Sequence, residues 1–191
     1  PFVPHSPRPV TPDNWECLDG TLYIDDEGQP WMVFCHEWKQ VYDGEMRAMK
    51  LSKDLSAPAG EPVLLFRASE APWTKCYEVV CMENGTEIKK ETYVTDGPFI
   101  YRTKDNQLLM LWSSRGNQGY AMGIARSASG KITGPWTHDE EPLYAKDGGH
   151  GMIFKTFDGQ LMLTIHTPNK TPNERPVFLK IKEENGKLIL I

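Results

Sequence analysis

Hydrophobic and polar positions alternate along most of this chain with the period of β-strands. In three places two apolar runs flank a short polar turn, within residues 18–34, 95–112 and 149–165. The runs are rich in aromatic and aliphatic residues, and turn-forming residues join them. This combination predicts three β-hairpins.

The three predicted hairpins share a layout. Each opens on a polar residue that is followed by Gly, and these leading residues are Asp19, Asp96 and His150. The turns lie 9, 10 and 9 positions further on, near Gly28, Asn106 and Gly159. Aspartate is a poor strand residue, and its carboxylate is costly to bury unpaired. Recurrence of a polar residue before the turn favours a shared role, although Asp-Gly is also a common turn dipeptide.

A further strand candidate follows each hairpin, in residues 44–55, 119–136 and 176–191. Three or four antiparallel strands in a unit of about 50 to 75 residues are what one blade of a β-propeller needs. We therefore predict one partial all-β propeller domain, residues 1–191, with about three to four blades. The blade-like units are about 14–72, 93–144 and 145–191. A sandwich of hairpins is the alternative.

In a propeller the first strand of every blade lines the central channel. Asp19, Asp96 and His150 would then converge at one end of that channel. Two carboxylates facing each other in a partly desolvated channel push their pKa values apart, so that one stays protonated while the other stays charged. Such a pair is suited to general acid catalysis of glycosidic-bond cleavage. Tryptophans near strand ends would offer flat faces to sugar rings, and the candidates are Trp15, Trp38 and Trp73.

Composition narrows the classes of partner. The chain has 191 residues, enough for one sizeable core, and a formal charge of −5 with its basic residues dispersed. This argues against nucleic acid as a partner. No apolar run approaches the roughly 20 residues that a membrane span needs, so no membrane partner is expected. The first residues show no signal peptide, and localisation stays unknown from the residues alone.

As a set, four segments resemble glycoside hydrolase family 43, whose members are five-bladed β-propellers. They are residues 15–34, 95–114, 119–136 and 148–178. The resemblance implies hydrolysis of O-glycosidic bonds in plant-type polysaccharides that contain arabinose or xylose. The family acts by inversion with three carboxylates: an Asp base, an Asp that tunes the acid, and a Glu acid. For the parent protein a secreted or periplasmic location is expected.

The resemblance also assigns roles. Asp19, in "CLDG", matches the Asp that tunes the pKa of the acid, and Asp96, in "TDGP", matches the acid. His150, in "GGHG", resembles a channel histidine that contacts calcium or another ion, directly or through water. No cofactor is implied as required, and a structural calcium ion in the channel is the metal suggested. Arg175 is a candidate to bind sugar hydroxyls, with a salt bridge to Glu174 as the alternative.

Two departures from the family pattern matter. The acid position carries Asp, one methylene shorter than Glu, and a shift of about an ångström can be costly where positioning is critical. Glu37, after the second strand of the first unit, is therefore a reserve candidate for the acid. The base belongs to a blade N-terminal to the residues present. Three units cannot close a five-bladed ring, so this is expected to be the C-terminal portion of a catalytic domain, inactive alone.

Three hypotheses follow. The first is a glycoside hydrolase like arabinofuranosidases, xylosidases and arabinanases, acting on an oligosaccharide or polysaccharide. The second is a non-catalytic carbohydrate-binding propeller, in which Asp at the acid position marks lost activity. The third is a structural repeat domain. In each case the missing N-terminal blades or a neighbouring chain would cover an open edge, because unpaired strand edges aggregate.

Overall fold

The computed structural model describes residues 1–81 and 84–191 in full. Three four-stranded sheets make up most of it, each with its strands in chain order and every pair antiparallel. The strands of the first sheet are β1 (Cys17–Ile24), β2 (Pro30–His36), β3 (Glu45–Lys50) and β4 (Val63–Arg67). Those of the second are β7 (Asp96–Arg102), β8 (Leu108–Gly116), β9 (Gly119–Ser127) and β10 (Trp136–His138). Those of the third are β11 (Gly149–Lys155), β12 (Leu161–Thr167), β13 (Arg175–Glu184) and β14 (Lys187–Leu190).

The described helices are a single short turn each. They are α1 (Trp38–Val41) and the 3-10 helix η1 (Ala68–Glu70). The prediction of an all-β chain with no long helix is therefore confirmed. In the described part of the chain, no helix has the length and apolar character to cross a membrane.

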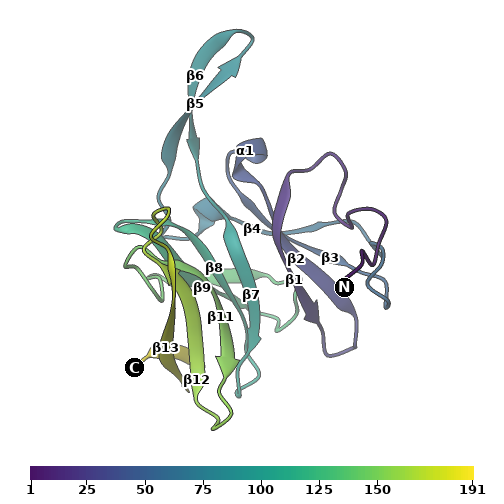
Figure 1. The fold of residues 1–191 in the computed structure, drawn as a ribbon, viewed down its shortest axis with the longest axis vertical. Coiled ribbons are helices and arrows are strands. Elements are labelled where there is room, and N and C mark those ends of the chain that lie inside the picture. Colours follow the sequence, from purple (N-terminus) through teal and green to yellow (C-terminus); the bar gives the residue numbers. More distant parts are fainter.

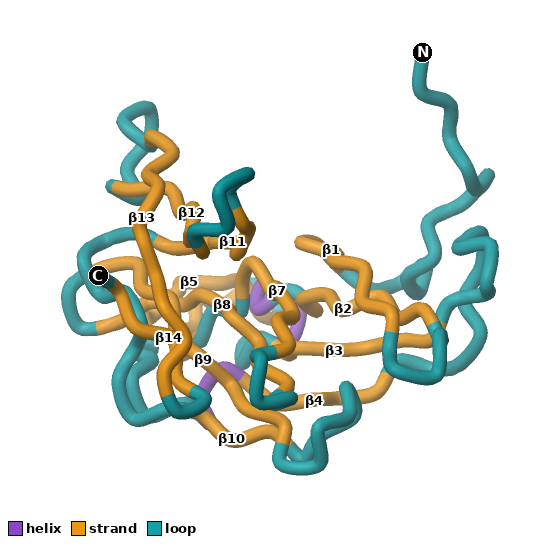
Figure 2. The backbone as a smooth tube through the Cα atoms, turned by 90° about the horizontal axis from the view of Figure 1, so that it is seen from below, coloured by secondary structure: helices purple, strands orange, loops and turns teal.

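The three sheets stand side by side as blades of a partial propeller. The first strands β1, β7 and β11 are neighbours, with β7 in contact with both of the others. Figure 2 shows these strands on the inner side of an open arc, with β4, β10 and β14 on the outer side. The arrangement agrees with blades around a channel and not with a closed sandwich of two sheets.

Two clusters of buried apolar side chains fill the spaces between neighbouring blades, and a third, with Phe34 and Met49, packs on the first sheet against Val10 and Trp15. Strand β8 is apolar at successive positions because both of its faces are buried. Leu108, Met110 and Trp112 pack toward the first sheet, and Leu109 and Leu111 pack toward the third. This burial on both faces explains why the run from 108 to 112 shows no alternation of apolar and polar residues.

A bulge interrupts the first strand of each blade at the same place. The register shifts between Leu18 and Thr21, between Asp96 and Phe99, and between Gly149 and Met152. One residue in each bulge has a positive φ, and these are Asp19 (57°), Gly97 (50°) and His150 (51°). Each lies nine positions before the positive-φ residue of its hairpin turn, Gly28, Asn106 or Gly159. The residue equivalent to Asp19 and His150 is therefore Gly97, and Asp96 lies one position earlier.

A fourth, two-stranded sheet links the first two blades. Strands β5 (Tyr77–Glu83) and β6 (Thr86–Thr92) form a hairpin that projects away from the three blades (Figure 1). Asn84 and Gly85 make its two-residue turn with φ of 51° and 80°, which matches the Asn-Gly preference of such turns. The blade pattern of the sequence did not predict this hairpin.

Apolar side chains are exposed on the two outer blades. On β1 the outward-facing positions include Leu22 and Ile24, which are 47% and 58% exposed. On the third sheet Met152 and Phe178 are 51% and 60% exposed. These faces belong to the blades at the two ends of the arc, where the described residues supply no neighbouring blade.

Candidate active site

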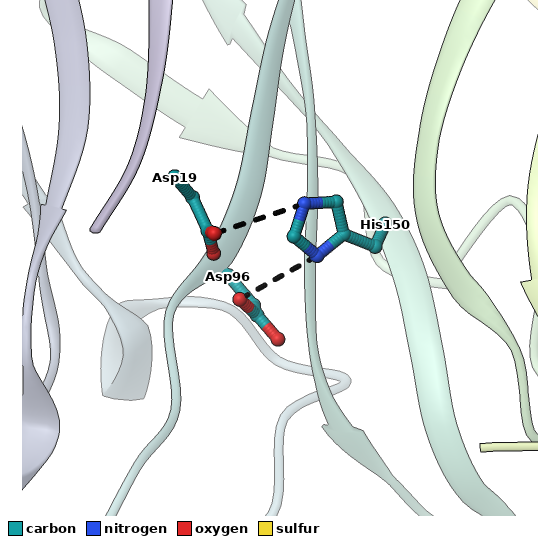
Figure 3. A group of neighbouring side chains, drawn as sticks. All are labelled: Asp19, Asp96 and His150. Carbon is teal, nitrogen blue, oxygen red and sulfur yellow. Dashed lines mark ion pairs between the residues drawn. The ribbon is translucent and has the colours of Figure 1, made fainter. Parts of the chain in front are cut away.

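The structure brings Asp19, Asp96 and His150 together at one end of the three inner strands (Figure 3). One side-chain oxygen or nitrogen from each lies within 4.8 Å of the others. The Nε2 atom of His150 is 3.8 Å from Oδ1 of Asp19, and its Nδ1 atom is 3.6 Å from Oδ1 of Asp96. The three residues are far apart in sequence, and the equivalent bulges of β1, β7 and β11 place them together.

Gly97 explains the Asp-Gly-Pro sequence at the start of β7. Its φ is 50°, and a Cβ atom there would lie 2.7 Å from the ring of His150. Its backbone N–H donates a hydrogen bond of 3.1 Å to Oδ2 of Asp19. Glycine is therefore required both for the backbone conformation and for the close approach of the channel histidine.

The two carboxylates have opposite electrostatic environments. Burial and a hydrogen bond with Asp19 raise the pKa of Asp96 to about 8, and the charges of Asp19 and Glu37 act in the same direction. Burial also acts to raise the pKa of Asp19, but the bonds from Asp96 and the Gly97 N–H, together with His150, hold it below its ordinary value. Near neutral pH the pair therefore holds one proton on Asp96 and one negative charge on Asp19.

Glu37 lies outside this cluster but close enough to influence it. It follows β2 directly, precedes α1, and is 7% exposed. Burial raises its pKa, and the charge of Asp19 adds to the effect while Lys39 opposes it. Glu37 is thus a second carboxyl group in the region that favours the protonated form.

Two residues at the site were not predicted from the sequence. The hydroxyl of Tyr120 donates a 2.6 Å hydrogen bond to Oδ2 of Asp96. The Oγ atom of Ser113 accepts a 2.8 Å hydrogen bond from the backbone N–H of His150. Ser113 lies on β8 and Tyr120 on β9, behind the inner strand β7. At these positions the sequence pattern indicates only core residues.

The three predicted sugar-binding tryptophans differ in exposure and packing. Trp73 is 4% exposed and packs on Trp112 with ring centroids 4.8 Å apart, so the expectation of an exposed platform there is wrong. Its ring lies over Gly123, where a Cβ atom would come within 2.3 Å, and this close packing holds it in the core. Trp38 is half-buried in α1 with its ring edge-on to Tyr77. Trp15 is covered on one face by the ring of His36, which stacks on it at 4.1 Å.

Arg175, the candidate to bind sugar hydroxyls, is exposed. It pairs with Thr167 in the third sheet, at the same end of that sheet as His150. One guanidinium nitrogen, Nη1, donates to the backbone carbonyls of Pro172 and Glu174 at 3.0 and 2.7 Å. These bonds hold its own loop, and its contact with sugar stays a prediction.

A cavity of about 260 Å³ lies at the bulges of the inner strands. Its lining includes Asp19, Gly97 and His150, together with the neighbouring Thr21, Phe99 and Met152. Asp19 and His150 therefore face a space into which a ligand group could enter, and Asp96 lies behind them, 3.6 Å from His150.

The side chains of Asp19, Asp96 and His150 do not by themselves match a calcium site. They offer two carboxylate oxygens and one imidazole nitrogen. Calcium takes six to eight oxygen ligands, and a carboxyl group that retains its proton is a poor ligand. We derive no chemical step through a metal, and the channel calcium with His150 as its ligand stays a prediction.

Comparisons with known proteins agree with this geometry. The model of the family described as "Glycosyl hydrolases family 43" matches residues 1–184. The extracellular exo-α-(1→5)-L-arabinofuranosidase ArbA of Cellvibrio japonicus is 26% identical over 182 residues, which cover 84% of this chain and 47% of that protein.

Two solved structures extend the comparison. The endo-arabinase of Bacteroides thetaiotaomicron aligns with a TM-score of 0.85 and 47% identity, over 98% of this chain and 63% of that one. The α-L-arabinofuranosidase of Lactobacillus brevis aligns with a TM-score of 0.70 and 17% identity, over 92% and 55%. The chain spans about half the length of the curated relative and less than two thirds of these structures. From the family match and the site geometry, the chain belongs to glycosyl hydrolase family 43.

Proposed function

We propose that the protein hydrolyses O-glycosidic bonds in arabinose- or xylose-containing polysaccharides, with inversion of configuration. The observation that carries the proposal is the pair Asp19 and Asp96, one charged and one protonated, of which Asp19 lines a cavity at the bulges of the inner strands. Similarity to an endo-arabinase and to an extracellular exo-arabinofuranosidase supports the substrate class, and the latter supports a secreted or periplasmic location.

In this proposal Asp96 is the proton donor. Its raised pKa keeps the proton at neutral pH, ready for transfer to the leaving-group oxygen. Asp19 remains ionised, accepts a hydrogen bond from Asp96, and so holds the acid in its protonated form and in one orientation. Trp38 and Arg175 are proposed to contact sugar units further from the cleaved bond.

Asp19 is not proposed as the base. An inverting acid and base lie about 6.5 to 9.5 Å apart so that a water molecule fits between them. Atoms of Asp19 and Asp96 lie within 4.8 Å, closer even than the roughly 5 Å of a retaining pair. We therefore place the base on a further blade, outside the residues described. Further blades would also cover the exposed apolar faces of β1 and the third sheet.

Glu37 is the second candidate for the acid, because it is buried and its pKa is raised. Its longer side chain also matches the Glu usual in the family. Kinetics separate these two candidates for the acid.

The test uses the protein as its gene encodes it, with arabinan or xylan fragments and an activated aryl glycoside. Asp96→Asn should lower kcat about 100-fold or more on the natural substrates but far less on the aryl glycoside, whose leaving group needs little protonation. Asp19→Asn should lower both the rate and the basic-limb pKa. If Asp96→Asn leaves the natural-substrate rate nearly unchanged while Glu37→Gln abolishes it, Glu37 is the acid. No turnover of any substrate, with retained sugar binding, would favour the non-catalytic alternative.

A further inference from the structure

We propose that Tyr120 is a positioning residue for the acid: its hydroxyl fixes one carboxyl oxygen of Asp96 as an acceptor and leaves the transferable proton on the other. The inference rests on the proposed role of Asp96 as proton donor. It assigns to each oxygen of that carboxyl group a separate task.

The phenol reaches Asp96 from two strands away. Asp96 on β7 pairs with Ser113 on β8, and Tyr120 lies on β9 two positions from the partner of Ser113. The Tyr120 hydroxyl donates 2.6 Å to Oδ2 of Asp96, and the residue is only 5% exposed. The bond is thus shielded from water, where a hydrogen bond to a carboxyl group is strongest.

The tyrosine ring is held on several sides. His166 of β12 stacks on it with ring centroids 5.4 Å apart. At Gly149 of β11 a Cβ atom would lie 2.9 Å from Cε1 of Tyr120 and 2.6 Å from Oγ of Ser113, so only glycine allows this approach. The backbone N–H of Tyr120 donates to Oδ1 of Asp147 at 3.1 Å. With its ring fixed, the hydroxyl has a fixed position relative to β7.

The donor role of the hydroxyl decides where the acid carries its proton. A carboxylic acid has one proton, and an oxygen that accepts a short bond from a phenol is the less favourable place for it. The proton therefore resides on Oδ1, which faces the channel 3.6 Å from Nδ1 of His150. The same bond lowers the pKa of Asp96, against the larger raising effect of burial.

The test is a carboxyl titration that does not depend on catalysis. Asp96 is followed by ¹³C NMR in the full-length protein, in wild type, Tyr120→Phe and Tyr101→Phe, with EDTA present so that no cation bound near His150 contributes to the midpoint. Tyr101 is the matched control because its hydroxyl also donates to a carboxylate, that of Glu183, at the other end of β7. Tyr120→Phe should raise the Asp96 midpoint by about half a unit or more, and Tyr101→Phe should leave it unchanged.

Kinetics then separate positioning from general structural damage. Tyr120→Phe should shift the basic limb of the pH–rate profile upward and lower kcat about tenfold on natural substrates, with little change in KM. A merely structural residue would lower the rate on natural and activated substrates equally and leave the pH limb in place.

An unchanged Asp96 midpoint in folded Tyr120→Phe overturns the inference, even if Asp96→Asn proves Asp96 to be the acid. If Tyr120→Phe shifts the Asp96 midpoint but Asp96→Asn leaves kcat unchanged, the contact between Tyr120 and Asp96 is supported. The assignment of Asp96 as the acid is then refuted. If Tyr120→Phe does not fold, 3-fluorotyrosine at position 120 keeps the shape and strengthens the donor. The Asp96 midpoint should then fall, and a midpoint that stays or rises overturns the inference.

Discussion

Asp96 carries a free-energy cost for the fold, because its carboxyl group is buried beside another carboxylate. Its pKa of about 8 in the folded chain lies far above the ordinary value of 3.8. The folded state therefore holds a proton that the unfolded state has lost, over the window from about pH 4 to 8. Stability from this group is fully present below that window and is lost as the pH rises through it.

Asp96→Asn should therefore stabilise the protein most at high pH. Asparagine has the shape of the protonated acid and can keep the bonds to Asp19 and Tyr120. We expect Tm to rise by a few degrees at pH 8.5, which is about 1–2 kcal/mol, and by much less at pH 5. Thermal unfolding across this range measures it.

A second group, His138, also makes the stability of the protein depend on pH. Burial lowers its pKa to about 4, so the wild type loses stability as the pH falls from 6.5 to 4 for an unrelated reason. The difference between wild type and Asp96→Asn removes that contribution. A variant equally or less stable at pH 8.5 would contradict the raised pKa of Asp96.

For individual residues, the sequence predicted that the three polar side chains cluster but not the backbone conformation at the bulges that carry them. The recurrence of Asp19, Asp96 and His150 was visible, and so was the unequal spacing of 10 against 9 positions in the second hairpin. That extra position is the bulge offset that makes Gly97, not Asp96, the equivalent residue. Tyr120 left no signal, because its ring reaches its partner across a whole strand and no local pattern encodes such a contact.

Among the elements, the β5–β6 hairpin stands apart from the blades. At its base Tyr77 meets Trp38 and the guanidinium of Arg115, and the ammonium of Lys90 lies 3.9 Å from the ring centroid of Tyr42. Its strands alternate in exposure, and Val80 is 63% exposed. The Asn-Gly turn signal was present in the sequence, but the mixed charges around it concealed the strands. The alternating blade strands were predictable because one face of each is buried.

Shortening this hairpin should leave the blades intact. Replacing residues 79–90 with Asn-Gly keeps the pairs Tyr77–Thr92 and Glu78–Glu91 at its base. We expect Tm to change by no more than about 3 °C, since those of the excised residues that the structure describes contribute no side chain to the hydrophobic core. Differential scanning calorimetry gives the answer.

The contrasting truncation ends the chain at Gly186 and so removes β14. This deletes Leu188, which is 5% exposed within the core, and losses of that kind cost about 2–5 kcal/mol. Should the hairpin deletion prove as damaging as this truncation, the hairpin is part of the folding unit and not an appendage.

The molecule as a whole is an arc with apolar end faces. Sheets that expose such apolar faces tend to associate with other protein surfaces, including those of a second copy. The 191 residues expressed alone should therefore self-associate at micromolar concentration, as sedimentation velocity would show.

Replacing Leu22, Ile24 and Phe178 with threonine should shift the 191-residue chain toward monomer. Tm should not fall, because all three side chains point outward. The control is Val33→Thr, which alters the core and should lower Tm while leaving association in place. A monodisperse, cooperatively unfolding wild-type monomer would show that the end faces need no cover.

The number of blades and their order followed from the repeated hairpins, since each unit is local in sequence. What covers the end faces could not be predicted from these residues, because it depends on surfaces that lie outside them.

The bulge repeated in β1, β7 and β11 bears on how such propellers diverge. When a blade is duplicated, the bend in its first strand is copied with it, and so is a side chain aimed at the channel. A single codon change at that position then exchanges one channel group for another while the surrounding sheet keeps its course. Asp19 and His150 occupy the same backbone position in two blades, with a carboxyl group in one and an imidazole in the other. Reaction chemistry in this architecture can therefore evolve one blade at a time.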